Sequence, residues 1–335
     1  MSGAVVVLAR DQVASCLEGR SGDVLAAVRS AYEAHAAGAT SVPLSAFLAV
    51  PSDPSARIVG MPAYLDAGEE VAGVKWSSSF PGNVRVGKDR ASSVIVLNSP
   101  ADGRATTLME ASAVNVHRTG ASAALAATAL HGEQAPEVVG AIGCGPINLS
   151  IVRYLQAVYS PVHRLLVFDV IGERARVFAE QVHTFAPDLT VEAAASAEEV
   201  LRAAPLVSIA TNTRAPHLTD LSGCPAGATL LHMSVRDILP EEIGRYDNVV
   251  DDVDHVLRVN TSLHLLEQRR GHREFIRTTL GEVLRGDAPA RRRSGELLVY
   301  SQFGLGILDL AVAELVRVTA EKAGLGTLVP GFHAG

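Results

Sequence analysis

From about Glu137 onward the chain alternates short apolar runs with amphipathic stretches, and this pattern limits the possible folds more than any other feature. Strands of a parallel sheet covered by helices on both faces form continuous apolar runs. We expect strands at 138–142, 165–169, 206–210, 229–233, 248–252 and 297–300. The segments 148–159 and 171–184 have the apolar spacing of amphipathic helices. The second half of the chain is therefore predicted to be a doubly wound α/β domain.

A glycine-rich loop follows the first of these strands. In a dinucleotide-binding loop G-x-G-x-x-G, the glycines permit a tight turn, a close approach to the pyrophosphate and close helix packing, in that order. Gly143 and Gly145 fill the first two positions, and Asn148 replaces the third. Pro146 and Ile147 open a predicted helix whose N-terminal amides would face phosphate. We therefore expect this loop to bind a dinucleotide.

Asp169, at the end of the second predicted strand, bears on the identity of the cofactor. An acid at that place accepts hydrogen bonds from the ribose of NAD and repels the 2′-phosphate of NADP. The cofactor is therefore predicted to be NAD, with Thr211, just beyond the third predicted strand, as a further contact. The alternative is a glycine turn in an unrelated α/β fold, with Asp169 as a helix cap.

The first half of the chain has a different pattern. A helix is expected at 23–37, and Pro, Gly and Asp turns separate β-rich segments at 57–64, 71–80, 93–98 and 106–110. An alanine-rich helix at 112–130 would lead into the nucleotide-binding half, and a last helix at 306–323 would return to the first module. We predict an α+β substrate-binding and dimerisation domain of residues 1–122 and 306–335, and an NAD-binding Rossmann domain of residues 123–305.

Composition and charge exclude several functions. The 335 residues are 48% hydrophobic and 19% charged, which is typical of a compact protein with a large core. The formal net charge of −7 gives no general attraction to nucleic acid, and the basic run at 291–293 is expected to be a solvated loop. No apolar run approaches the ~18 residues of a membrane span. The first residues lack a basic leader, so we expect a cytoplasmic protein.

The cysteines give no sign of a metal site. Cys16, Cys144 and Cys224 lie far apart and form no C-x-x-C pair, which argues against a disulfide framework and a structural zinc ion. A group of acids and a histidine near residue 251 resembles a metal cluster, but neighbouring strand residues point to opposite faces. We expect a solvated strand end, without metal, at Asp251, Asp252, Asp254 and His255.

Two cations on otherwise apolar segments are candidates for anion binding. Lys75 lies in the predicted strand 71–80, where a lysine either reaches water or meets an anion in a cleft. Arg118 lies on the predicted helix 112–130. Its guanidinium would either bind a carboxylate or phosphate through two parallel hydrogen bonds or form a structural ion pair. Both alternatives remain open for each residue.

Polar residues also follow the predicted strand 229–233. Asp237 lies just beyond it, at the sheet edge where ligands bind in this fold, and is a candidate base or water-activating residue. Its alternative role is to cap a short helix at 238–243. His232 is expected to pack inside the strand rather than to take part in catalysis.

Motifs from both predicted domains occur in the order and spacing of the ornithine cyclodeaminase/mu-crystallin family. The signature between residues 71 and 127 comprises G-x-K, P-x-N, Asp-Gly, Leu-x-Glu and Arg-Thr, carried here by Lys75, Pro81, Asn83, Asp102, Gly103, Leu108, Glu110, Arg118 and Thr119. The chain resembles this family over most of its length. The resemblance implies an NAD-dependent enzyme that acts on an amino acid, and a homodimer formed through the first module.

The resemblance also assigns roles to single residues. Lys75 and Arg118 would hold a substrate carboxylate, and Asp237 would orient the attacking water. The glycine loop departs from the family's G-x-G-x-Q-A, and this departure is similar to one branch of the family. Members of that branch cleave N-(2-amino-2-carboxyethyl)-L-glutamate into 2,3-diaminopropionate and 2-oxoglutarate, for siderophores and peptide antibiotics. Strings around Ser78 and Arg236 also match, and these residues are carried over as substrate contacts.

Two alternatives to this reaction remain. One is a cyclodeaminase or imine reductase of the same family, acting on ornithine, lysine or a cyclic imine. The other is a mu-crystallin-like protein that binds nucleotide and ligand without turnover. Family cyclodeaminases carry a further carboxylate-binding arginine in a Pro-x-Arg context, whereas residues 42–45 read Val-Pro-Leu-Ser here. This difference argues against a plain ornithine pocket.

Overall fold

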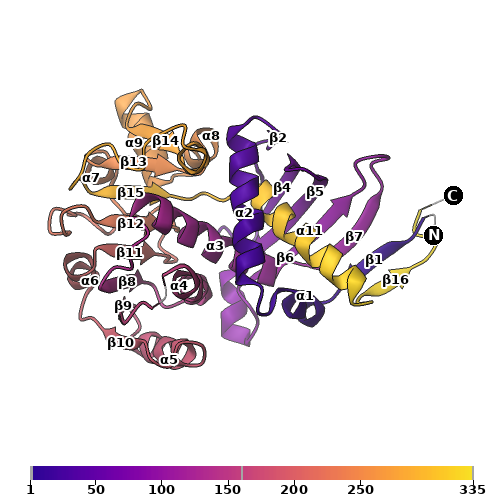
Figure 1. Ribbon diagram of the computed structural model, residues 1–335, viewed down its shortest axis with the longest axis horizontal. Coiled ribbons are helices and arrows are strands. Elements are labelled where there is room, and N and C mark those ends of the chain that lie inside the picture. The colour runs from indigo at the N-terminus through magenta and orange to yellow at the C-terminus, as the bar shows by residue number, and fades with distance from the viewer. Residues whose placement is uncertain (1–2, 160, 334–335) are drawn as a thin grey trace. The chain divides into compact units, whose positions relative to one another are not determined.

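The computed structural model describes residues 3–159 and 161–333, which form two compact units (Figure 1). One unit comprises Met1–Arg118 and Leu305–Gly335, of which residues 1–2 and 334–335 lie outside the described residues; the other is Thr119–Gly304. Within the described residues, each unit contains one eight-stranded sheet. The predicted α/β class with a Rossmann-type sheet is confirmed.

The sheet of the unit Thr119–Gly304 is parallel throughout, in the order β10-β9-β8-β11-β12-β15-β13-β14. Numbered in chain order within the unit, its first five strands follow the Rossmann order 3-2-1-4-5, with the topological switch point between β8 and β11. The sixth position is taken by β15, the last strand of the unit in the sequence. The strands are β8 Val138–Ile142, β9 Arg164–Phe168, β10 Thr190–Ala193, β11 Leu206–Ile209, β12 Thr229–His232, β13 Asp247–Val250, β14 Ile276–Thr279 and β15 Leu298–Ser301.

All six strands predicted in this unit are present, with small shifts at their ends, whereas β10 and β14 were not predicted. These two strands lie at the edges of the sheet and are only partly buried, so they lack the continuous apolar run of the interior strands. The helices are α4 Pro146–Val158, α5 Gly172–His183, α6 Ala197–Ala203, α7 Pro240–Ile243, α8 Val253–Val256, α9 Ser262–Arg270 and α10 Leu280–Arg285.

Apolar side chains of the interior strands and surrounding helices form the core of this unit. Val207, Leu230 and Val299 come from three neighbouring strands and are fully buried. Helix α6 approaches the sheet closely at Gly140, where a Cβ atom would lie 2.6 Å from Cγ1 of Val200. This close packing fixes the strand that leads into the glycine-rich loop.

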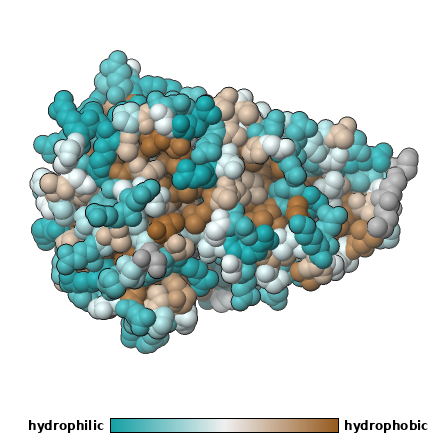
Figure 2. Space-filling model, in the orientation of Figure 1, coloured by the Kyte–Doolittle hydropathy of each residue, from teal (hydrophilic) through white to brown (hydrophobic). Residues whose placement is uncertain are grey.

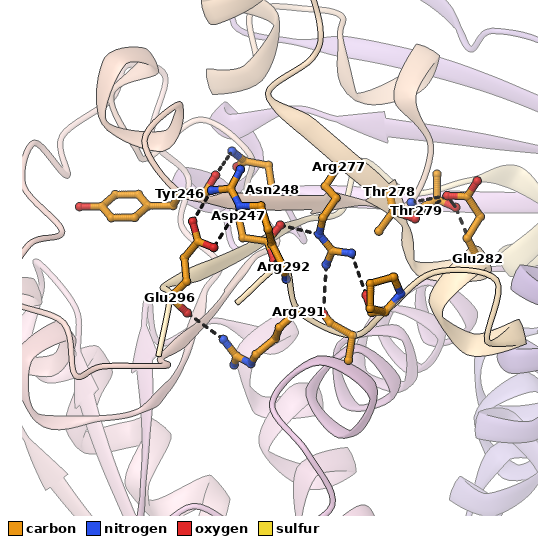
Figure 3. A network of polar contacts seen from close by, with 12 residues as sticks. Tyr246, Asp247, Asn248, Arg277, Thr278, Thr279, Glu282, Arg291, Arg292 and Glu296 are labelled. Atoms are coloured by element: carbon orange, nitrogen blue, oxygen red, sulfur yellow. Dashed lines mark hydrogen bonds and ion pairs between the residues drawn. The ribbon is translucent and has the colours of Figure 1, made fainter. Parts of the chain in front are cut away.

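Polar contacts hold the amino-terminal end of β13 (Figure 3). Asp247 is buried and accepts hydrogen bonds from Arg277 Nε at 2.7 Å and from the backbone N–H of Arg292 at 2.9 Å. Arg291 is half-buried and donates to the backbone oxygen of Glu296 at 3.0 Å, as well as to the Thr229 hydroxyl. The prediction of a solvated loop at 291–293 is therefore wrong for Arg291.

The prediction of a solvated strand end at residues 251–255 is also wrong for Asp251 and His255, whereas Asp254 is exposed. Asp251 is buried, and its carboxylate accepts hydrogen bonds from the backbone N–H groups of Phe303 at 3.0 Å and Gly304 at 2.6 Å. Burial raises the pKa of Asp251. His255 is also buried and lies edge-on to the Phe303 ring. No group of three metal-ligating side chains suited to an ion occurs among the described residues.

The unit Met1–Arg118 with Leu305–Gly335 has a mixed sheet in the order β16-β1-β7-β6-β5-β4-β2, with β3 paired to β4. Strands β4 to β7 form an antiparallel meander, and β1 runs parallel to β7. The strands are β1 Val5–Leu8, β2 Thr40–Ser41, β3 Ala46–Ala49, β4 Arg57–Asp66, β5 Glu70–Ser79, β6 Ala91–Asn98, β7 Ala105–Glu110 and β16 Thr327–Val329. The helices are α1 Arg10–Leu17, α2 Ser21–Ala36 and α11 Gly306–Lys322, with the 3₁₀ helix η1 Pro81–Val86 and the start of α3 Ser112–Leu130.

Helices α2 and α11 pack together, and α11 also packs against β4 and β5 (Figure 1). At Gly73 of β5 a Cβ atom would lie 3.2 Å from Leu310 of α11, so a glycine there lets the helix approach the sheet. The last helix therefore belongs to the same unit as α2, β4 and β5. Figure 2 shows hydrophilic and hydrophobic residues interspersed on the side where these helices lie.

No helix in the described part of the chain is long and apolar enough to cross a membrane.

Candidate active site

The glycine-rich loop forms a tight turn between β8 and α4. Gly143 has a φ of +93°, and a Cβ atom there would lie 2.4 Å from the backbone oxygen of Ala210, so only glycine fits. Gly145 is the N-cap of α4, and a Cβ atom there would meet no atom within 4 Å. Pro146 is exposed and Ile147 half-buried at the start of the helix. The loop thus presents a helix N-terminus with open space before it, as an anion requires.

Asn148 occupies the third glycine position with its side chain turned inward. It is fully buried, and its amide nitrogen donates to the backbone oxygens of Ile142 at 2.9 Å and Gly143 at 2.6 Å. Its amide oxygen accepts a hydrogen bond from the Ser208 hydroxyl of β11 at 2.6 Å. The side chain therefore ties the loop to the neighbouring strand. Asn148 thus supports the loop from inside, and its part in cofactor binding stays a prediction.

Asp169 follows β9 and lies beside this loop. One carboxylate oxygen accepts a hydrogen bond from the backbone N–H of Cys144 at 2.9 Å, and the other accepts one from Ile171 N–H at 2.9 Å. The N-cap of α5 is Ile171, so Asp169 does not cap that helix, and the alternative role given to it is wrong. The structure therefore brings Asp169 and the glycine-rich loop together.

Lys75 and Arg118 share a buried carboxylate, that of Asp309. Lys75 is 2% exposed, and its Nζ donates to Asp309 Oδ2 at 2.5 Å and to Asn115 Oδ1 at 3.2 Å. Arg118 donates from Nε to Asp309 Oδ1 at 3.1 Å and from Nη2 to Asn115 Oδ1 at 2.8 Å. Two cations and one carboxylate leave this cluster with one net positive charge when Lys75 is protonated.

Burial makes the charge of Lys75 sensitive to pH. Desolvation lowers the pKa of Lys75 to about 8; the Asp309 carboxylate opposes this shift, and the Arg118 guanidinium adds to it. The lysine is therefore charged below a pH of about 8 and loses its charge above it. An anion that binds this cluster would bind more weakly as Lys75 deprotonates.

The structure does not bring Ser78 to this cluster. Strand β5 pairs regularly with both neighbours, so residues three apart on it point to opposite faces. Lys75 is buried, whereas Trp76, on the face that Ser78 shares, is 45% exposed. The Ser78 hydroxyl shares a hydrogen bond with that of Ser92 at 2.8 Å. The structure therefore does not bring Ser78 together with Lys75, and its role as a substrate contact stays a prediction.

Asp237 lies in a second buried cluster, in the unit Thr119–Gly304. Its Oδ1 accepts hydrogen bonds from the Thr211 hydroxyl and from His217 Nε2 at 3.3 Å. Its Oδ2 accepts one from the Ser234 hydroxyl and lies 3.3 Å from His232 Nε2. The carboxylate is completely buried, so these neighbours replace its hydration shell.

The surroundings of Asp237 keep it ionised. Burial by itself would raise the pKa of Asp237, but hydrogen bonds from His217, His232 and Ser234 outweigh burial and hold this pKa below its usual range. Helix α7 begins at Pro240 with Leu239 as its N-cap, so the predicted role of Asp237 as a cap is wrong. A buried carboxylate with this many neighbours is a weak base and a strong anchor for a partner.

The backbone before Asp237 is strained. Val235 has a φ of +55°, which is rare for a β-branched residue and is found where surrounding contacts impose it. Its backbone oxygen accepts a hydrogen bond from Ser262 N–H at 2.8 Å. Arg236 donates from Nη2 to the backbone oxygen of Val259 at 3.0 Å, so part of its guanidinium is engaged within the unit.

Sequence reasoning missed several residues of these clusters. Asp309 had a detectable signal, since it is a lone acid in the apolar segment Gly-Ile-Leu-Asp-Leu-Ala-Val of the last helix, and a buried acid needs a cationic partner. Asn115 and His217 had none. His217 lies before β12 in a loop, and only the fold brings its imidazole to Asp237; its side chain is 41% exposed.

The comparisons with known proteins agree with this architecture. A sequence model of the ornithine cyclodeaminase/mu-crystallin family matches residues 6–324. The chain belongs to this family. It is 26% identical over 274 residues to N-((2S)-2-amino-2-carboxyethyl)-L-glutamate dehydrogenase of Staphylococcus aureus, covering 81% of each chain.

Solved structures show the same fold. The crystal structure of CmnK matches with a TM-score of 0.86 and 29% identity, covering 99% of this chain and 100% of that one. The Δ1-pyrroline-2-carboxylate reductase of Thermococcus litoralis, solved in complex with NADH and L-proline, matches with a TM-score of 0.89 and 24% identity, covering 96% of this chain and 99% of that one.

Replacing Asn148 by the glycine of the common loop motif should harm this protein. Asn148→Gly removes three buried hydrogen bonds, two of them to backbone oxygens of the loop, which should cost about 1–3 kcal/mol of stability. Urea unfolding measures this loss. Gln268→Gly, at an exposed position of α9, is the control for the introduction of glycine alone. Equal losses in both variants would contradict the supporting role.

Proposed function

We propose that this protein oxidises the secondary amine of N-(2-amino-2-carboxyethyl)-L-glutamate with NAD and hydrolyses the product. The substrate carbon loses a hydride to NAD⁺ and the amine loses a proton, which gives an imine and NADH. Water adds to the imine carbon and the C–N bond breaks. The products are 2,3-diaminopropionate and 2-oxoglutarate. The buried cluster of Lys75, Arg118 and Asp309 carries this proposal, because its excess positive charge suits a substrate carboxylate.

The cofactor of the proposed reaction is NAD. The turn at Gly143, the open space at Gly145 and the start of α4 fit a pyrophosphate, and Asp169 lies beside them to accept bonds from a ribose. NAD supplies the hydride acceptor when bound. In this proposal the residues of the loop hold the dinucleotide, and Thr211 lies nearby, just beyond β11. The reaction with the substrate depends on the two polar clusters.

Lys75 and Arg118 hold the substrate carboxylate in this proposal. The Arg118 side chain is 9% exposed, and hydrogen bonds to Asp309 and Asn115 use only part of its five N–H donors. Asp309 binds both cations and fixes their orientation, so they need not reorganise when the substrate binds. Arg236 stays a proposed further contact.

The Asp237 cluster handles the water and the proton. Both carboxylate oxygens of Asp237 already have two neighbours each, so direct activation of water by this group would require one of them to leave. His217 is the partly exposed member of the cluster. We therefore assign the water-positioning role to the His217 imidazole, with Asp237 fixing its orientation, as acids do for catalytic histidines.

A homodimer formed through the first module is part of this proposal. Trp76 of β5 and Val94 of β6 are directly paired and are 45% and 39% exposed, so this face of the sheet presents apolar side chains to a partner. A second copy of the chain is the partner expected for this face. A cytoplasmic location and a role in siderophore or antibiotic biosynthesis stay predictions.

The direct test is incubation of the purified protein with NAD⁺ and N-(2-amino-2-carboxyethyl)-L-glutamate. NADH should form and mass spectrometry should find 2,3-diaminopropionate and 2-oxoglutarate in equal amounts. NADP⁺ should be much poorer, and Asp169→Ala should narrow that difference. Oxidation of NADH by Δ1-pyrroline-2-carboxylate, without reaction of the glutamate conjugate, would favour the second candidate, an imine reductase; the similarity to the Thermococcus litoralis reductase supports that candidate.

The substrate clamp predicts a pH effect. As pH rises through about 8, Lys75 loses its proton and kcat/KM for the amine should fall. Lys75→Arg keeps the charge at higher pH, so the fall should move to higher pH in this variant. Arg118→Ala should lower kcat/KM by about 30- to 5,000-fold, because a lost charged contact costs about 2–5 kcal/mol.

Arg153→Ala, in the other unit, serves as the control for the loss of a guanidinium and should leave kcat/KM and its pH profile unchanged. NAD affinity, measured by calorimetry, should stay near the wild-type value in all these variants. Identical pH profiles for the wild type and Lys75→Arg would show that Lys75 does not bind the substrate.

Coupling between Asp237 and His217 can be measured in a double-mutant cycle. Asp237→Asn and His217→Gln should each lower kcat by about 10²–10⁴-fold. The double variant should be little worse than either single one, because the two side chains act as one pair. Effects that multiply in the double variant would mean that the residues act independently and would refute the proposed arrangement.

A further inference from the structure

Gln302 is a buried amide whose hydrogen-bonding groups are unused. It follows β15 directly and is 3% exposed. Of the buried amide side chains in the described part of the chain, it alone has no hydrogen-bond partner at either its nitrogen or its oxygen. Buried polar groups nearly always have partners, and an exception needs a water, a ligand or a function to explain it.

The backbone around Gln302 is held firmly on both sides. Its own N–H donates to the backbone oxygen of His232 at 3.3 Å, and the Ser301 hydroxyl lies 3.3 Å from His232 Nδ1. The next two N–H groups, of Phe303 and Gly304, bind the Asp251 carboxylate. The backbone that carries the amide is therefore fixed while the amide itself stays available, which suits a binding group.

The topology places Gln302 in one half of the dinucleotide-binding sheet. In this fold each half of the sheet binds one mononucleotide, on either side of the switch point between β8 and β11. Asp169 follows β9, on the ribose-binding side expected for adenosine. Gln302 follows β15, two strands beyond β11 in the other half, at the carboxyl edge where ligands bind.

The chemistry of the unused groups narrows the choice of ligand. A carboxylate would satisfy only the amide nitrogen, since it cannot donate to the amide oxygen. The carboxamide of nicotinamide carries a donor and an acceptor side by side and can satisfy both groups of a glutamine amide. We propose that Gln302 binds the nicotinamide carboxamide of NAD and so fixes the orientation of the ring. This inference rests on the NAD dependence of the proposed function.

Binding measurements on the wild type give a first test. Calorimetry with NAD⁺ and with its 3-acetylpyridine analogue compares ligands that differ in the carboxamide NH₂, which the analogue replaces with a methyl group. The analogue leaves the Gln302 oxygen without a donor, so it should bind about 5- to 30-fold more weakly than NAD⁺. Equal affinities for the two dinucleotides would overturn the proposal.

The variant Gln302→Met removes the amide and keeps a side chain of similar length. It should bind NAD⁺ about 5- to 30-fold more weakly than the wild type and should no longer distinguish NAD⁺ from the acetyl analogue. ADP-ribose, which lacks the nicotinamide ring, should bind both proteins equally. The matched control Gln268→Met makes the same change at an exposed position of α9 and should leave all three affinities unchanged.

The remaining outcomes each have a defined meaning. An equal loss of affinity for NAD⁺ and ADP-ribose would make Gln302 a structural residue, and unchanged NAD⁺ affinity would mean that only water completes its hydrogen bonds; both overturn the inference. Absence of NAD⁺ binding by the wild type would instead refute the proposed function itself. The comparison of the two dinucleotides on the wild type remains decisive if Gln302→Met does not fold.

Discussion

The carboxylate of Asp309 is the contact on which the substrate-binding proposal and the packing of its unit both depend. Lys75 and Arg118 are buried, and without a counter-charge each would have to be hydrated or neutral. Asp309 supplies one negative charge to both, from a helix that packs against the strand carrying Lys75. Removing it would leave two adjacent cations in a place that water hardly reaches.

The two polar clusters use a buried carboxylate in opposite ways. Asp309 stabilises two cations, of which Lys75 is charged only below a pH of about 8, and at that charge the balance favours a further anion. Asp237 is surrounded by hydroxyl groups and imidazoles, so its own negative charge dominates its surroundings. A substrate carboxylate is attracted by the first arrangement and repelled by the second. In the proposed function, the same amino-acid type therefore serves the binding of a substrate in one cluster and the handling of a proton in the other.

The sequence was sufficient to predict the interior strands of the fold and insufficient to predict which polar groups are buried. Interior strands could be predicted because a short, continuous apolar run between turns suits a buried strand. The glycine-rich loop could be predicted because its backbone conformation at residue 143 requires a glycine. The burial of Asp251 and the inward orientation of the Asn148 side chain could not be predicted, because each depends on backbone groups or side chains that only the fold brings near. Strand alternation alone predicts that Ser78 lies on the face of β5 opposite to Lys75.

The position of α11 after the unit Thr119–Gly304 affects how the protein is made. Asp309 lies 234 residues after Lys75, and the unit Thr119–Gly304 is continuous between the two parts of the other unit. At a synthesis rate of about 5–20 residues per second, the sheet face that α11 covers stays uncovered for tens of seconds before the helix is synthesised. The unit Thr119–Gly304 can fold on the ribosome during this interval, while the other unit is incomplete. Nascent chains are therefore exposed to aggregation until α11 has been synthesised.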